Sequence, residues 1–197
     1  IIDLLIALEG SNLTASDIPL LWPEIGPKRA RNWLLQNLKQ AKVKTGQFKM
    51  ALQINKRDQL KKTKINDLSA IFEFTDGDLT YSRFLPRLRQ AEGRVIISQE
   101  QVDIWLKRGQ AASLKIEDLK VEFGKLRKPA SRYLLIKGRQ DQAFSALLDY
   151  LLFSKMAQPK RRKFTEKFSD AVINADYQLR LPLGSKPQLK DWQIEVS

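Results

Sequence analysis

Apolar residues recur along the chain mostly at the three- and four-residue spacing of amphipathic helices, with shorter stretches of two-residue alternation between them. This spacing predicts helices over residues 1–9, 14–25, 27–42, 65–74, 79–92, 99–108, 116–126, 143–152 and 164–175. Alternation and β-branched residues predict strands over residues 43–54, 94–98, 132–138, 177–181 and 192–196. A strand over 70–74 is the alternative to helix 65–74. The pattern therefore predicts a mixed α+β protein that is mainly α-helical.

The first quarter of the chain has a distinctive order of predicted elements. A helix, a short helix after a turn, and a basic amphipathic helix beginning at Pro27 are followed by Phe48, Met50, Leu52 and Ile54 in alternation. With Gly46 as a turn, this last stretch is interpreted as a two-stranded hairpin. Over residues 1–54 the order resembles a winged helix-turn-helix domain. The resemblance implies a recognition helix at Lys28 to Lys39, lying in a DNA major groove, and a wing at Lys44 to Lys49.

Composition predicts how the chain divides into domains. With 197 residues and 43% hydrophobic content it can bury a core. We expect a winged-helix-like domain over 1–55, a basic linker or exposed helix over 56–64, and a mixed helical domain with short strands over 65–197. A second winged-helix-like unit over 65–138 is an alternative for part of the last region, although no convincing internal repeat supports it.

The positive charge is concentrated in one segment. Between Lys28 and Lys64 there are twelve Lys or Arg residues and one acid, Asp58, so this segment carries +11 of the net charge of +13. Clustered cations on a folded scaffold attract a polyphosphate through Coulomb attraction and counterion release. The charge therefore indicates nucleic acid as the partner, with a solvated basic surface as the alternative.

Candidate contact residues follow from side-chain chemistry. Arg29, Arg31, Asn32 and Gln36 suit base edges, and lysine suits phosphate. The wing, the segment after it and a second basic cluster add further phosphate contacts. The complete predicted nucleic-acid-binding set is Lys28, Arg29, Arg31, Asn32, Gln36, Lys39, Lys42, Lys44, Lys49, Arg57, Lys61, Lys62, Arg127, Lys128 and Arg132.

Several kinds of chemistry are excluded or weakened by composition. The chain has neither cysteine nor histidine, so disulfides, cysteine-ligated metals and histidine-based catalysis are unavailable. No catalytic residue, metal or cofactor is predicted. A metal-dependent nuclease built on Glu117, Asp118 and Lys120, or on Asp191 and Glu195, is the enzymatic alternative. No apolar run reaches the roughly 20 residues that span a bilayer, and a cytoplasmic location is expected. Because the chain begins at Ile1, we expect a piece of a longer protein.

Taken together, these features predict a non-catalytic DNA-binding protein that uses a basic recognition helix and wing, as a regulator, a replication or partition factor, or a subunit of a nucleoprotein complex. DNA is favoured over RNA, no membrane partner is expected, and a homodimer or larger complex is an alternative assembly. An RNA-binding or ribonucleoprotein subunit and a winged-helix module that binds protein are the other readings.

Overall fold

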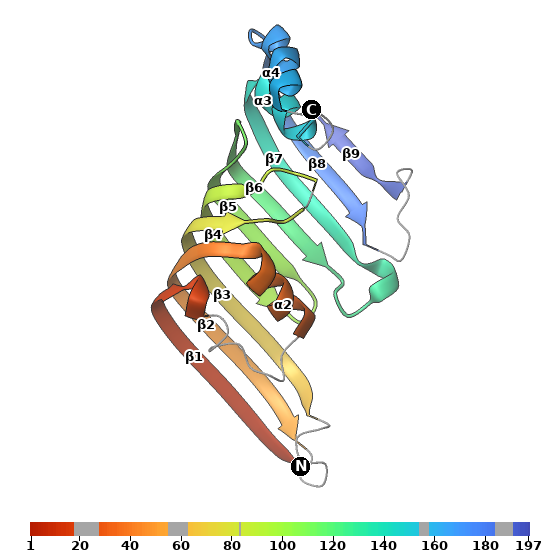
Figure 1. Cartoon of the computed structure of the whole chain (residues 1–197). Coiled ribbons are helices and arrows are strands. Elements are labelled where there is room, and N and C mark those ends of the chain that lie inside the picture. The colour runs from red at the N-terminus through yellow and green to blue at the C-terminus, as the bar shows by residue number, and fades with distance from the viewer. Residues whose placement is uncertain (18–27, 55–62, 83, 154–157, 184–190) are drawn as a thin grey trace.

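The computed structural model describes residues 1–197 except 18–27, 55–62, 83, 154–157 and 184–190 (Figure 1). Within these residues nine strands form one antiparallel sheet in which each strand pairs with its neighbours in sequence. The strands are β1 (Ile2–Thr14), β2 (Leu38–Ile54), β3 (Lys64–Leu79), β4 (Leu88–Ser98), β5 (Val102–Ala111), β6 (Leu114–Gly124), β7 (Tyr133–Ala143), β8 (Val172–Pro182) and β9 (Gln193–Val196). The helices are α2 (Lys28–Asn37), α3 (Phe144–Leu151) and α4 (Gln158–Thr165), with 3₁₀ turns η1 (Ala15–Asp17), η3 (Pro129–Ser131) and η4 (Glu166–Phe168).

The prediction of a mainly helical α+β protein is wrong, because the sheet holds most of the chain. Residues predicted as helices at 1–9, 65–74, 99–108 and 116–126 lie instead in β1, β3, β5 and β6. Other predictions are confirmed: the strands over 94–98, 132–138, 177–181 and 192–196 fall in or largely within β4, β7, β8 and β9. The apolar helix predicted at 143–152 is α3.

The winged helix-turn-helix interpretation is also wrong. Residues 38–54 form one inner strand, paired with β1 on one side and β3 on the other, so Lys44 to Lys49 do not form a wing. Gly46 lies in mid-strand opposite Gly10, where an added Cβ would come within 2.9 Å of the Phe72 ring. It provides close packing instead of a turn. The basic helix does exist as α2, but β2 begins directly after it at Leu38.

The register places one row of apolar residues across the whole sheet. Directly paired positions share a face, and the row runs Gly10, Gly46, Phe72, Val95, Ile104, Val121, Ile136, Leu179 and Ile194. We call this face the inner face. The adjacent positions on the opposite, outer face are mainly polar: Thr45, Glu73, Arg94, Trp105, Lys120, Lys137, Gln178 and Glu195.

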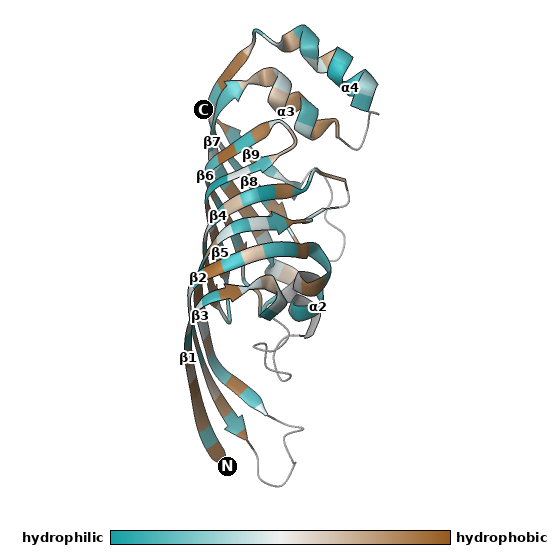
Figure 2. Cartoon of the chain, turned by 60° about the vertical axis from the view of Figure 1, so that its left-hand side comes forward, coloured by the Kyte–Doolittle hydropathy of each residue, from teal (hydrophilic) through white to brown (hydrophobic). Residues whose placement is uncertain are grey.

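The strands bend along a line that crosses the sheet. Asn12 in β1, Asp76 in β3, Gln90 in β4 and Asp118 in β6 all have a positive φ, between 48° and 55°. Register shifts accompany the bend in β2, β3 and β4. Bulged residues of this kind kink a strand and increase its twist. In Figure 2 the sheet is seen nearly edge-on, with α2, α3 and α4 all on the same side.

The strand connections divide between two ends of the sheet, which we name the helix rim and the loop rim. The helix rim carries η1, α2, residues 80–87, the turn at 112–113, and α3 with α4. The loop rim carries residues 99–101 between β4 and β5, residues 125–132 between β6 and β7, and the start of β3 at Lys64. The core cluster lies along the bend: Leu88 precedes Gln90 on the helix-rim side, and Ala91 and Leu106 lie just beyond it.

In an ordinary strand position valine gives a more stable protein than glycine. At a bend position with positive φ we expect the opposite order. At Asp118, with φ of 48°, Asp118→Val should lower the free energy of unfolding by about 1–2 kcal/mol, while Asp118→Gly should leave it equal or higher. At the outward Lys120 of the same strand, Lys120→Gly should be the worse substitution, by about 0.5–1 kcal/mol. Urea unfolding of the four variants checks this. A valine at 118 that is tolerated as well as glycine would contradict the bend.

Candidate functional site

The inner face is the largest chemically uniform surface of the described chain. Besides the row already given, a second row crosses eight strands with apolar residues alone: Leu8, Phe48, Ala70, Ile97, Val102, Phe123, Leu134 and Leu181. From β1 to β6 the inner positions on these two rows carry no polar side chain. The surface therefore presents hydrocarbon over several strands, with no hydrogen-bonding group on it.

Part of this face is covered and part is not: on β2 and β3 the inner residues Met50, Leu52 and Ala70 are at most 4% exposed. On the helix-rim side Leu88, Ala91, Leu106, Ala111 and Leu114 are at most 6% exposed, and they lie near α3 and residues 80–87. On the loop-rim side the inner residues of β4 to β8 are half-buried: Val95, Ile97, Val102, Val121, Phe123, Leu134, Ile136, Leu179 and Leu181. Neighbouring strands contact these side chains laterally. We call these nine residues the open half of the inner face.

The helix rim is held by a buried ion pair. Arg161 of α4 donates from Nε to Asp149 of α3 at 2.5 Å, and Asp149 also accepts from the Ser113 hydroxyl at 2.6 Å. The Arg161 guanidinium lies 5.0 Å from the centre of the Phe153 ring, and its side chain is 9% exposed. These contacts join α3, α4 and the turn between β5 and β6. An open cavity of about 750 Å³ lies here, with Ala112, Ser145, Gln158 and Thr165 in its lining.

The buried charges of the Arg161–Asp149 joint are satisfied by each other and by the Ser113 hydroxyl. Burial alone would raise the pKa of Asp149, but hydrogen bonds from Ser113 and Arg161 lower it below its ordinary value of 3.8. Exposed pairs at the same rim join Lys42 to Asp76, at 3.0 Å, and Arg162 to Glu166, at 2.9 Å. The cavity therefore lies beside an ion pair in which the charge of Arg161 is balanced by Asp149. This pairing favours a structural role for Arg161.

Tyrosines close the covered half of the inner face. The hydroxyls of Tyr81 and Tyr150 lie 2.9 Å apart, and this contact ties residues 80–87 to α3. Burial raises the pKa of Tyr81, Tyr150 and Tyr177 above the ordinary value of 10.0. These hydroxyls stay protonated near neutral pH, so they supply neither a general base nor a nucleophile there. Within the described residues, no group of three acidic side chains is placed to hold a metal ion, and this includes the nuclease candidates Glu117 and Asp118.

The structure spreads the predicted nucleic-acid-binding residues over several surfaces. Lys28, Arg29, Arg31, Asn32 and Gln36 lie in α2, with Lys39 just beyond it at the start of β2. Lys42, Lys44 and Lys49 follow along β2. Arg127, Lys128 and Arg132 lie in the connection at the loop rim, and Arg57, Lys61 and Lys62 fall outside the described residues.

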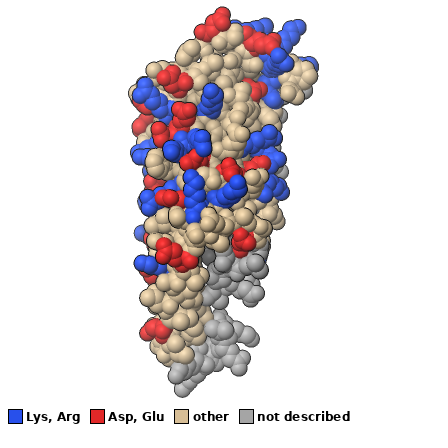
Figure 3. Space-filling model, turned by 90° about the vertical axis from the view of Figure 1, so that its left-hand side faces the viewer, with Lys and Arg blue, Asp and Glu red and all other residues tan. Residues whose placement is uncertain are grey.

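Acidic neighbours accompany the cations of β2 and the outer face. Lys44, Lys107 and Arg108 all lie within 4 Å of the Glu92 carboxylate. Figure 3 shows one side of the molecule, where basic and acidic side chains are interspersed. The described fold is mainly β and carries mixed charge on its outer face. It contains no pairing of a recognition helix with a wing, so the prediction of DNA binding through those two elements is wrong. Binding to RNA or to a protein partner stays a prediction from charge alone.

The open half of the inner face was missed by sequence reasoning, although a signal for it exists. Ile97 and Val95 alternate with the outward Ile96 and Arg94, and Phe123 and Val121 alternate with Glu122 and Lys120. Such alternation indicates one apolar and one polar face. Bulges interrupt the two-residue alternation in most strands. The sequence therefore matched the three- and four-residue spacing of helices more often than the spacing of strands.

Comparison with family models, with curated proteins and with solved structures finds no match for this chain. The function must therefore be inferred from the fold and its surfaces. Among the described residues, no helix is both long enough and apolar enough to cross a membrane.

The buried pair at the helix rim predicts a specific acid sensitivity. Because the folded pKa of Asp149 is lowered, its stabilising contribution is complete above the ordinary value of 3.8 and is lost as the pH falls through the folded value. Asp149→Asn should lower the free energy of unfolding at pH 7 by about 2–3 kcal/mol and should flatten the loss of stability on acidification.

The exposed pair of Arg162 with Glu166 provides the matched control. Glu166→Gln should change the unfolding free energy by less than about 1 kcal/mol, because both side chains are more than 60% exposed. Urea titrations from pH 7 to pH 3 measure both variants. If the two variants lose the same unfolding free energy, the ion pair of Asp149 with Arg161 does not stabilise the contact between α3 and α4.

Proposed function

We propose that this protein binds the acyl chains of lipids on the open half of its inner face. The observation that carries the proposal is the pair of uninterrupted apolar rows, which cross eight and nine strands. A sheet with one apolar face ordinarily buries that face against a second layer. Here the inner residues of β4 to β8 on the loop-rim side are half-buried, although Met50, Leu52 and Ala70 on β2 and β3 are buried.

The chemistry of the face favours acyl chains over a polypeptide. Interfaces between proteins typically form about one hydrogen bond per 100–200 Å². The open half of the inner face consists of Val, Ile, Leu and Phe side chains, which can form none. The backbone groups beneath them are paired between strands, so they are not offered to a partner either. Hydrocarbon can cover such a surface without leaving a polar group unsatisfied.

The dimensions of the sheet also suit long apolar chains. Nine strands at roughly 4.8 Å spacing give a width of roughly 40 Å across the strands, while one bilayer leaflet contributes roughly 15 Å of hydrocarbon. The inner face can therefore hold several chains side by side, each lying along the strands, where the six-residue step from Ala91 to Ile97 spans roughly 20 Å. The bend raises the helix-rim portions of the strands and gives this surface a wall on one side (Figure 2).

The outer face supports the same division of roles. Its residues beside the two apolar rows include Glu122, Lys120 and Lys137, and Lys44, Lys107 and Arg108 lie within 4 Å of the Glu92 carboxylate. This face is suited to water. The molecule is therefore amphipathic at the level of the whole sheet, with one aqueous and one hydrocarbon side.

Adjacent residues on opposite faces give the sharpest test. Ile97 points to the inner face and Ile96 to the outer face. Ile97→Asp should reduce affinity for a fluorescent fatty acid on the order of a hundredfold, because a charge in hydrocarbon costs about 2.5–3.5 kcal/mol. Ile96→Asp should bind like the unchanged protein. Fluorescence titration and mass spectrometry of extracted lipid measure the two, and circular dichroism verifies folding.

If Ile97→Asp fails to fold, the milder pair Ile97→Asn and Ile96→Asn takes its place. Equal binding by the two members of a folded pair would refute the proposal, since a site on the inner face must distinguish them.

The length of the ligand provides an independent prediction. Each methylene that enters the apolar surface contributes about 0.8 kcal/mol, so affinity should rise about fourfold per added methylene in a series of saturated fatty acids. Isothermal titration over chains of increasing length measures this slope. Affinity that depends on the carboxylate but not on chain length would point to an ionic surface instead.

A further inference from the structure

Basic residues gather at the loop rim, directly beside the open half of the inner face. The charged side chains described along this rim are Lys64, Lys125, Arg127, Lys128 and Arg132 against Glu100 and Asp191. Lys125 follows Phe123 by two residues, Arg132 precedes Leu134 by two, and Lys64 is next to Ile65. A strand rises about 3.3 Å per residue, so Lys64, Lys125 and Arg132 each lie within one or two residues of an inward apolar side chain, and Arg127 and Lys128 lie in the connection between β6 and β7.

Several cations at the helix rim are closely paired with acids: Lys42, Arg87, Arg161 and Arg162 each lie 2.5–3.0 Å from a carboxylate. At the loop rim Arg127 lies 3.8 Å from Glu100, and both side chains are 59% exposed. Lys64, Lys125 and Lys128 form no ion pair with any described residue. The loop rim therefore keeps positive charge that no described residue neutralises.

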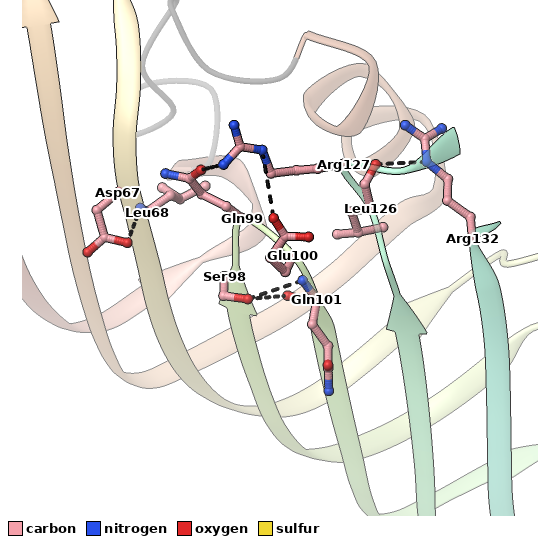
Figure 4. A network of polar contacts seen from close by, with 9 residues as sticks. All are labelled: Asp67, Leu68, Ser98, Gln99, Glu100, Gln101, Leu126, Arg127 and Arg132. Atoms are coloured by element: carbon pink, nitrogen blue, oxygen red, sulfur yellow. Dashed lines mark hydrogen bonds and ion pairs between the residues drawn. The ribbon is translucent and has the colours of Figure 1, made fainter. Parts of the chain in front are cut away.

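The loop rim is also organised as a unit, as Figure 4 shows. Arg127 donates from Nη1 to the Gln99 side-chain oxygen at 2.8 Å, and the Leu126 amide donates to the Glu100 carbonyl at 2.9 Å. Arg132 donates from Nε to the Leu126 carbonyl at 2.8 Å. These bonds join the connection between β4 and β5 to the connection between β6 and β7, and so fix where the basic side chains emerge.

One polar atom at this rim has no partner. The Gln99 Nε2 group is buried and makes no hydrogen bond to any described residue, while the oxygen of the same amide is held by Arg127. An unsatisfied buried donor is costly, and proteins usually provide an acceptor for it. A ligand that brings acceptor oxygens to the loop rim would suit this donor and the neighbouring cations together.

We infer that the loop rim binds the anionic headgroups of phospholipids whose acyl chains lie on the open half of the inner face. This rests on the proposed function and adds a lipid class and an orientation to it. The chains extend from the loop rim toward the bend, and the phosphate stays at the rim, near Lys64, Lys125 and Lys128. The cations of the loop rim lie at one end of the apolar surface. This arrangement matches a phospholipid, whose charged headgroup and acyl chains lie at opposite ends of the molecule.

The experiment compares phosphatidylglycerol with phosphatidylcholine of identical acyl chains. The unchanged protein should bind the anionic lipid about tenfold more tightly at low salt, and the preference should shrink at high salt. The triple variant Lys64→Gln, Lys125→Gln, Lys128→Gln should lose this preference and keep its affinity for phosphatidylcholine. A triple variant of outward lysines, Lys49→Gln, Lys120→Gln, Lys137→Gln, has the same net charge and should retain the preference.

The other outcomes are distinguishable. If both lipids bind equally to the unchanged protein, or if the outer variant loses the preference as fully as the rim variant, the headgroup site is wrong while the acyl-chain site stands. Absence of binding to either lipid overturns both proposals. Glycerol 3-phosphate, which has no chains, should not compete at millimolar concentration. Displacement of bound lipid by short duplex DNA would assign the rim to nucleic acid and overturn the inference.

Discussion

The line of bends across the sheet is the constraint on which the other features depend. Four polar residues with a positive φ, from Asn12 in β1 to Asp118 in β6, lie where the strands kink. Asn and Asp accept this backbone region at lower cost than most residues, and the bend turns one face of the sheet inward. The covered core of Leu88, Ala91 and Leu106 forms along this line, and the half-buried apolar surface of β4 to β8 lies on its loop-rim side.

Within the described residues, the single bent sheet buries only part of its apolar surface. The core cluster is small, while large apolar residues such as Leu4, Leu8 and Ile194 are 42–65% exposed. Exposed apolar surfaces of this extent mark places where a protein meets something else. The absence of hydrogen-bonding side chains on the two rows is the basis for the proposed hydrocarbon ligand, and the cations at the loop rim are the basis for the proposed headgroup position.

Sequence reasoning recovered the regular parts of this fold and failed where the bends lie. The run of β-branched residues at Val95 to Ile97 and the alternation at Tyr177 to Leu181 predicted strands that are present. In β6 the bend at Asp118 separates the inward Ile116 and Leu119 by three positions, and Phe123 follows four later, so a strand shows helical spacing. The site was missed for a related reason: the charge of the segment from Lys28 to Lys64 drew attention to polyanions, while the apolar rows exist only once strands far apart in sequence are placed in register.

The order of the strands has a consequence for how such a molecule can vary. Each strand is hydrogen-bonded to the strands next to it in sequence, so no chain crosses the sheet and no pairing depends on a distant segment. Adding or removing one hairpin would change the capacity of the hydrocarbon surface by two strand spacings, roughly 10 Å, and would leave every remaining pair intact. Evolution could thus tune the size of the cargo by duplication alone, with selection acting on the alternation of each new strand and on its single kink.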